Sequence, residues 1–270
     1  MAHYLKYMKT KENMQNYPPN NSKKTKSTPI TYRRMRSRLV KYGAIGFILN
    51  AAIYLITEFI AALGTNQDLG YVYSKQFISA LGVYPGQIAD GVPNNFSPLA
   101  IVMNLGFIVT AFGFSISYAL LLYPKLKDRN TKLACSLMMV ATLFSIGSLL
   151  VGLFQGGVPN QDSLHGIGAR LSFLMGNLTL FFTGIFLKPN HKSYRLTAIL
   201  LSIIGISFAF LLQYAITNKL TEVAAIYERL TVYPIIAWEL ITGIIFLKES
   251  IQTKYNLAPR TKKENKDETE

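Results

Sequence analysis

Residues 133–154 read LACSLMMVATLFSIGSLLVGLF and contain no charged side chain. At ~1.5 Å per residue, a helix of this length spans about 33 Å, which matches the ~30 Å hydrocarbon core of a bilayer. A helix of a water-soluble protein would be interrupted by polar surface positions. The stretch therefore predicts a transmembrane helix.

Similar apolar runs recur along the chain and are separated by short polar segments. Each run is about 20 residues long, which is enough to cross a bilayer as a helix. The six expected spans are residues 42–63, 98–123, 133–154, 164–187, 196–216 and 230–247. The sequence thus predicts an all-α fold, a polytopic transmembrane helix bundle formed by residues 42–248.

Both ends of the chain are polar. Residues 1–41 hold eleven Lys or Arg against one acid, Glu12, and this composition predicts a basic, disordered cytoplasmic tail. Residues 249–270 form a second charged tail. The long N-terminal polar stretch has no early apolar core, so no cleavable signal peptide is expected.

The orientation follows from the distribution of positive charge, because cytoplasmic loops of membrane proteins are enriched in Lys and Arg. Apart from the tails, most basic residues lie in the connections 124–132 and 188–195. The opposite loops hold only Lys75, Lys219 and Arg229. Both termini are therefore expected in the cytoplasm, with the protein in the cell (plasma) membrane.

The formal net charge of +14 is explained by this orientation, and the sequence predicts no nucleic-acid partner. The expected partners are membrane lipids. A juxtamembrane cluster of basic residues acts either as a topology anchor or as a binding site for anionic headgroups; its members are Arg33, Arg34, Arg36, Arg38 and Lys41. The sequence gives no indication of oligomeric state.

Few residues are suited to hold a metal or cofactor. Cys135 is the single cysteine, so neither a disulfide nor a cysteine metal site can form within the chain. Phosphate-binding glycine loops, zinc-protease motifs and nucleophile elbows are also absent. We therefore expect no metal and no cofactor.

Three ionisable residues lie within the expected spans: Glu58, Arg170 and Glu239. Charged groups are costly at membrane depth, and such residues often have a specific role. Glu58 lies roughly 7 Å and Arg170 roughly 9 Å below the outer membrane surface. The two either form an ion pair or are separately hydrated in an outward-open cavity. Glu239 lies near the midplane and is either a neutral, hydrogen-bonded carboxyl or a proton or cation carrier.

The fourth span also presents His165, Arg170 and Asn177 on roughly one side. His165 is in the first turn of this helix, where it can serve as a general base or bond to a neighbouring loop. Asn177 is of the type that joins helices by hydrogen bonds. These residues, together with Glu58 and Glu239, form the predicted polar cluster, in which His165 is the one candidate catalytic residue.

Several short motifs occur in a characteristic order. They are Ile78-Ser-Ala-Leu-Gly-Val, Asn95-Phe-Ser, Gly152-Leu-Phe, Leu164-His-Gly-Ile-Gly-Ala, Phe173-Leu-Met-Gly-Asn-Leu-Thr-Leu, and Tyr227-Glu-Arg-Leu followed by Trp238. Together they resemble the prokaryotic membrane family called domain of unknown function 998. The resemblance covers about residues 42–248 and implies a six-helix integral membrane protein without an established activity. The positions that match the recurring elements are Ser79, Gly82, His165, Gly166, Asn177, Glu228 and Arg229, most of them at or near the outer face.

Three functions are compatible with these residues. The first is a non-catalytic membrane protein, such as an accessory or ligand-binding subunit. The second is a small ion-coupled transporter that uses Glu239 with the Glu58 and Arg170 pair. The third is an intramembrane enzyme that modifies lipids, with His165 as general base and Arg170 bound to an anionic headgroup. Convergence of His165, Arg170, Glu58 and Glu239 on one cavity would favour the second or third.

Overall fold

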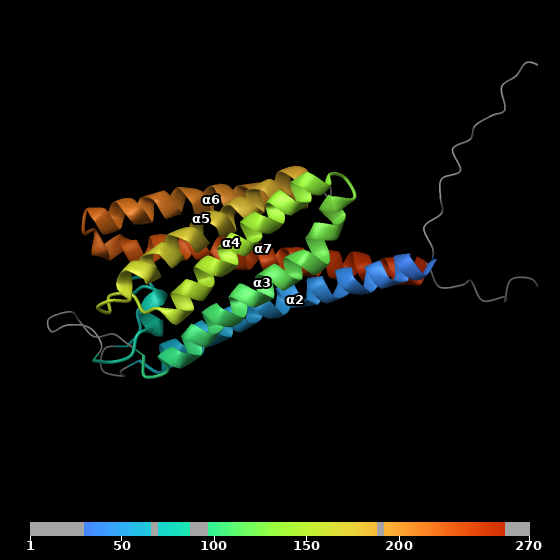
Figure 1. Ribbon diagram of the computed structural model, residues 1–270. Coiled ribbons are helices and arrows are strands. Elements are labelled where there is room, and N and C mark those ends of the chain that lie inside the picture. Colours follow the sequence, from blue (N-terminus) through green and yellow to red (C-terminus); the bar gives the residue numbers. More distant parts are fainter. Residues whose placement is uncertain (1–29, 66–69, 87–96, 188–191, 257–270) are drawn as a thin grey trace, which may run out of the picture. The chain divides into compact units, whose positions relative to one another are not determined.

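The chain forms long helices connected by short segments in a computed structural model, which describes residues 30–65, 70–86, 97–187 and 192–256 (Figure 1). The elements in chain order are α2 (Ile30–Leu63), η1 (Ser79–Gly82), α3 (Ala100–Lys127), α4 (Thr131–Leu153), α5 (Asp162–Phe186), α6 (Lys192–Thr217) and α7 (Thr221–Asn256). The described residues contain no strand. The chain divides after Met35, and all contacts given below lie within residues 36–270.

Six of these helices are long and apolar enough to cross a membrane. The spans are Ser37–Leu63, Ala100–Lys127, Thr131–Leu153, Asp162–Phe186, Lys192–Thr217 and Thr221–Gln252. The predicted all-α bundle of six membrane-length helices is thereby confirmed.

Two helices begin earlier than the apolar runs alone indicate. Helix α2 begins at Ile30, so residues 30–41, which were expected in a disordered tail, are helical. Helix α7 begins at Thr221 and carries Glu228 and Arg229 in its first turns. The remaining parts of the two expected tails, residues 1–29 and 257–270, lie outside the described residues.

The α3–α4 connection shows how local chemistry sets the helix ends. Asn130 has an extended backbone, and its side chain accepts a 3.1 Å hydrogen bond from Leu133 N–H at the start of α4. Such a cap satisfies one of the free N–H groups of the first helical turn. Helix α3 continues through Pro124 to Lys127, so it extends past the apolar run that predicted a span ending at residue 123.

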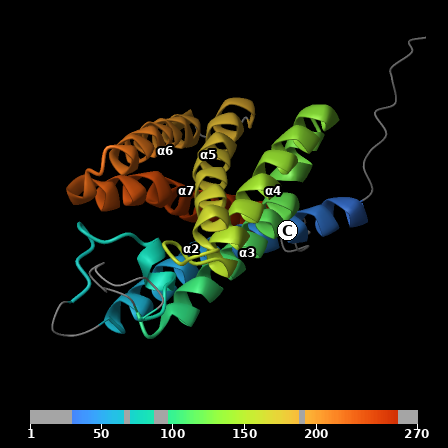
Figure 2. The same ribbon diagram turned by 60° about the vertical axis from the view of Figure 1, so that its left-hand side comes forward.

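Neighbouring helices in the chain are mostly neighbours in space. Helices α3 to α7 pack in chain order, and α5 also contacts α7. Figure 2 shows α5 between α4 and α6. Helix α2 packs closely against α3 and α7 through glycines: a side chain at Gly43 would clash with Leu121, and one at Gly243 would clash with the backbone of Ala44.

The core of the bundle is aromatic. The rings of Phe47 (α2), Phe114 (α3) and Trp238 (α7) are fully buried. Their edge-to-face contacts place Phe47 5.7 Å from Phe114 and 5.5 Å from Trp238 between ring centroids. Such pairs add to the burial of apolar area. They hold α2, α3 and α7 together.

One end of the bundle carries most of the connecting structure. Figure 1 shows η1, the α4–α5 turn and the α6–α7 turn at the same end. We call this the outer end, following the orientation expected from charge. Residues 70–86, which include η1, are called the outer segment below.

Candidate functional site

Glu58 has a different partner from the one expected. Its side chain is 2% exposed, and its carboxylate lies 3.6 Å from Nη2 of Arg229. The Tyr233 hydroxyl donates a 2.9 Å hydrogen bond to the same carboxylate oxygen. Arg170 instead lies on α5 beside α6, where its Nε donates a 3.0 Å hydrogen bond to Gln213. Of the two arrangements expected for Glu58 and Arg170, the ion pair is therefore not formed, because the α7 face packed on α2 supplies the cation.

Arg229 connects the outer segment to α7 through hydrogen bonds and ring contacts. Its Nη1 donates a 2.6 Å hydrogen bond to the carbonyl of Gln76, and its Nη2 donates to the Tyr71 hydroxyl. The guanidinium also lies over the rings of Tyr71 and Tyr73, 5.5 Å and 5.1 Å from their centroids. Burial raises the pKa of the Tyr71 phenol above its usual value, so the hydroxyl keeps its proton. One arginine thus joins a carboxylate, a carbonyl and two aromatic rings.

Glu228 and Gly82 fix the outer segment at two further points. The Glu228 carboxylate accepts hydrogen bonds from the backbone N–H of Ile78 and, at 3.5 Å, of Ser79. The Asn104 side chain donates a 2.8 Å bond to the carbonyl of Gly82. A Cβ at Gly82 would lie 2.3 Å from Oδ1 of Asn104, so this position requires glycine.

His165 is buried at the start of α5 with one nitrogen engaged. Its Nδ1 lies 2.8 Å from the carbonyl oxygen of Phe154. A carbonyl can only accept, so Nδ1 carries the hydrogen and Nε2 is the atom that can gain or lose a proton. A Cβ at Gly156 would lie 3.0 Å from Nε2, so glycine keeps the space beside this atom open.

A large cavity lies between the outer segment and the outer ends of α5 and α6. Its volume is about 940 Å³, and we call it the outer cavity. Helices α5 and α6 are in close contact at Gly184 and Gly205, and both line the cavity nearer the outer end. Apolar side chains make up much of the wall, including Phe173, Leu174 and Phe210. The cavity is within the size range of small-molecule sites, about 300–1,000 Å³.

The charged groups of the outer cavity are of two kinds. The carboxylates of Glu228 and Asp162 already accept backbone hydrogen bonds, in the case of Asp162 at 2.6 Å from Gly157 N–H. The cations Arg170 and Lys75 have no carboxylate partner among the described residues. Arg170 is exposed, and within the described ranges only its Nε is bonded. The carboxylates of the cavity therefore already accept hydrogen bonds, whereas its two cations have no carboxylate partner among the described residues.

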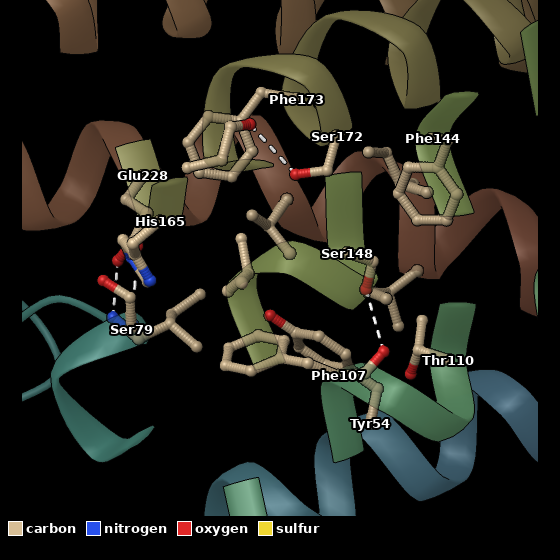
Figure 3. A pocket seen from close by; sticks show the side chains of 16 residues that line it. Tyr54, Ser79, Phe107, Thr110, Phe144, Ser148, His165, Ser172, Phe173 and Glu228 are labelled. Atoms are coloured by element: carbon tan, nitrogen blue, oxygen red, sulfur yellow. Dashed lines mark hydrogen bonds between the residues drawn. The ribbon is translucent and has the colours of Figure 1, made fainter. Parts of the chain in front are cut away.

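A small pocket extends from the outer cavity toward the bundle core. Its volume is about 40 Å³, and we call it the inner pocket. Its wall shares a set of residues with the outer cavity: Ser79, His165, Ala169, Phe173 and Glu228. Figure 3 shows Ser79, His165 and Glu228 on one side of it, with Thr110, Ser148 and Tyr54 on the other. The inner pocket thus adjoins the outer cavity and reaches the α2–α3 side of the core.

Glu239 lies apart from both spaces. It is 0% exposed on α7, and its Oε2 accepts a 2.8 Å hydrogen bond from the Asn50 amide. Its Oε1 has no hydrogen-bond partner among the residues that the structure describes. Glu239 therefore does not share a site with Glu58, which is near the outer end, or with Arg170, which lines the outer cavity. Of the four predicted ionisable residues, only His165 and Arg170 share a space.

Asn177 acts within the helix bundle. Its amide donates to the carbonyls of Phe173, at 2.8 Å, and Thr231, at 3.1 Å, and so links α5 to α7. A Cβ at Gly205 would lie 1.8 Å from its Oδ1, which brings α6 to the same point. Gly166, by contrast, lines the outer cavity and has open space around it.

The described residues contain no group of three or more His, Cys, Asp or Glu able to hold a metal ion. The sequence does not predict the position of Lys75 at the outer cavity or of the tyrosines around Arg229. Lys75 was counted only as a topology signal, and Tyr71 and Tyr73 lie in a loop without periodicity. A pair of aromatics near an intramembrane arginine is a signal that could have found them.

These features define a class: α-helical multi-pass membrane proteins with an amphipathic cavity at one end of the bundle. The family described as "Protein of unknown function (DUF998)" matches residues 44–245, and the chain belongs to this family. The expected resemblance is thereby confirmed. Searches of the curated proteins and of the solved structures found no match.

Proposed function

We propose that this integral membrane protein binds an amphipathic anion, a molecule with an apolar chain and a phosphate or carboxylate head, in the outer cavity. The observation that carries the proposal is the combination of an apolar wall with two cations, Arg170 and Lys75, that have no carboxylate partner in the part of the chain that the structure describes. Arg170 is the better suited of the two, because its planar guanidinium pairs with two oxygens of one head group.

The wall of the cavity supports the same ligand class. Phe210 is 68% exposed and Leu174 is 37% exposed, so both present apolar surface beside the cavity. A charged head at Arg170 would leave its chain against these side chains. Binding is then divided between an ion contact and apolar burial, as is usual for small-molecule sites.

The proposal is tested with two probes that differ only in the head, dodecyl phosphate and dodecanol. The full chain is placed in phosphatidylcholine nanodiscs, and the affinity of each probe is measured. A charge-assisted hydrogen bond contributes about 1.5–3 kcal/mol, so we expect about 10- to 100-fold tighter binding of the phosphate. Arg170→Gln removes this preference. Arg195→Gln, a change on an exposed residue at the other end of α6, leaves it intact.

Equal affinity for the two probes in the wild-type chain would disprove an anion site. A preference that persists in Arg170→Gln and disappears in Lys75→Gln would assign the head group to Lys75 instead.

A second function, hydrolysis of a bound lipid ester, is supported by the position of His165. Its Nε2 is not the atom that bonds to Phe154 and could accept a proton from a water molecule, and the residue lies on the wall shared by the two spaces. Release of fatty acid by the wild-type chain and not by His165→Gln would support this function. The transporter based on a Glu58–Arg170 pair has no such support, because that pair is not formed.

The same proposal includes orientation and location. The protein lies in a prokaryotic cell membrane with both termini on the cytoplasmic side, and the outer cavity opens on the opposite side. Its support is the charge distribution, with basic residues concentrated around the α3–α4 connection. This proposal also includes binding of anionic headgroups by the basic residues of the N-terminal segment. Residues 1–29 of that segment lie outside the described structure.

A further inference from the structure

Glu239 is an isolated carboxyl group in the core of the bundle. It is fully buried, and Asn50 is its hydrogen-bond partner, through Oε2 alone. No ion pair joins it to a cation among the described residues. A carboxylate without a cation is costly in an apolar environment, and such groups usually become neutral instead.

The contacts around Glu239 favour a proton over a metal cation as its ligand. The Asn50 amide directs a hydrogen at Oε2, and this positive hydrogen would repel a second cation at the same group. Two other buried titratable groups of the bundle have partners of their own: Tyr118 bonds to Thr183 at 2.9 Å, and Tyr194 bonds to Thr242 at 3.0 Å. A proton on Oε1 therefore gives Glu239 its neutral form without another charged partner.

Thr110 is joined to Glu239 through Asn50 and also lines the inner pocket. The Asn50 amide nitrogen that bonds to Glu239 also lies 3.4 Å from the carbonyl oxygen of Thr110. The Thr110 hydroxyl is buried and, like Oε1 of Glu239, has no hydrogen-bond partner in the described parts of the chain. Two such atoms on residues that contact the same amide are unusual, because buried polar groups are nearly always hydrogen-bonded.

The inner pocket provides the link to the outer end. Thr110 lines it, and its volume of about 40 Å³ exceeds the roughly 10–15 Å³ that one water molecule needs. Ser148 and Ser172 also line it, so water there has polar neighbours. Through His165 and Ser79 the pocket adjoins the outer cavity.

From these contacts we propose that Glu239 is a proton-binding site that exchanges its proton with the outer cavity by way of the inner pocket and Thr110. Water in the pocket delivers the proton to Oε1, and the Thr110 hydroxyl bridges the last step. This site is independent of the proposed anion ligand, and its test needs none.

The test uses infrared spectroscopy of the full chain in nanodiscs at neutral pH. A protonated carboxyl has a C=O stretching band that shifts when its hydrogen is replaced by deuterium. We expect this band in the wild-type chain, its absence in Glu239→Gln, and its shift after transfer to D2O. If Glu239→Gln does not fold, a displaced band in Glu239→Asp identifies the same group.

The route is tested with a matched pair of threonine variants. Thr110→Val should slow the deuterium shift about tenfold, the factor expected for the loss of one hydrogen bond in the path. Thr179→Val is the control, because Thr179 is equally buried on α5 and bonds to its own helix at Met175. A wild-type spectrum with no band assignable to Glu239 overturns the proton site. A band that never shifts in the folded protein, or equal rates in the two threonine variants, overturns the route.

Discussion

The guanidinium of Arg229 lies 3.6 Å from the carboxylate of Glu58, and the two side chains are 8% and 2% exposed. This buried pair joins α2 to α7, while the same arginine holds the outer segment through Gln76. The segment forms one wall of the outer cavity. The shape of the cavity therefore depends on the pair.

Arg229→Gln should destabilise the protein by about 3–5 kcal/mol, the cost of leaving a buried charge without its partner. Glu58→Gln should also be destabilising, because it leaves the buried Arg229 guanidinium without its carboxylate, although the amide oxygen can still accept from Tyr233. The double variant should be less destabilised than the sum of the two, since no lone charge remains. Denaturant unfolding of the four proteins in one detergent measures these differences. Strict additivity of the single changes would contradict an interaction between the two residues.

Arg170→Gln is the matched control for this series. Arg170 is exposed and makes one side-chain hydrogen bond, to Gln213. We expect the free energy of unfolding to change by no more than about 0.5 kcal/mol, as for other surface substitutions. A loss comparable to that of Arg229→Gln would assign Arg170 a role in folding and would weaken the case for an anion site.

Two glycines of α5, only two residues apart, should respond in opposite directions to alanine. A Cβ at Gly168 would lie 2.6 Å from Cβ of Leu150 and 2.8 Å from the backbone oxygen of Gly147, whereas one at Gly166 meets nothing within 4 Å. Gly168→Ala should therefore separate α4 from α5 and cost about 1–3 kcal/mol. Gly166→Ala should stabilise the helix by up to about 1 kcal/mol. Thermal unfolding of the two variants side by side provides the measurement, and equal effects would contradict the close α4–α5 packing.

The fold could be predicted from the sequence because apolar runs such as residues 133–154 are a strong and local signal. Helix starts were less predictable. Helix α7 begins at Thr221 and includes Glu228 and Arg229, and their charges conceal its first turns from an analysis based on hydropathy. Those charges are compatible with burial only because the outer segment and Glu58 satisfy them.

The candidate site was predicted in part. The sequence identified His165 and Arg170 on one helix, and both line the outer cavity. The partner of Glu58 could not be identified from its expected depth in the membrane, because depth does not determine which faces of the helices meet. Residues 58 and 229 are far apart in the chain, and their contact depends on the packing of α2 against α7.

Tyr71 should contribute to the pH dependence of stability. Burial raises the pKa of its phenol in the folded state, so the folded protein holds this proton more tightly than the unfolded chain does. The contribution of Tyr71 is then complete below the unfolded pKa of about 10 and is lost as the pH rises above it. Unfolding measured from pH 8 to pH 11 should show a shallower decline for Tyr71→Phe than for the wild-type chain. Identical slopes would indicate that the phenol is not buried against Arg229.

The proposed orientation can be tested with two single cysteines in a Cys135→Ser background. Lys75 and Arg129 are both exposed, and they lie in the outer segment and in the α3–α4 connection, respectively. If the outer cavity faces away from the cytoplasm, a membrane-impermeant maleimide should label Lys75→Cys in intact cells and Arg129→Cys only after permeabilisation. The reverse pattern would place the outer cavity on the cytoplasmic side and the two termini outside, against the positive-inside rule. Labelling of both cysteines in intact cells would contradict the assignment of these two regions to opposite sides of the membrane.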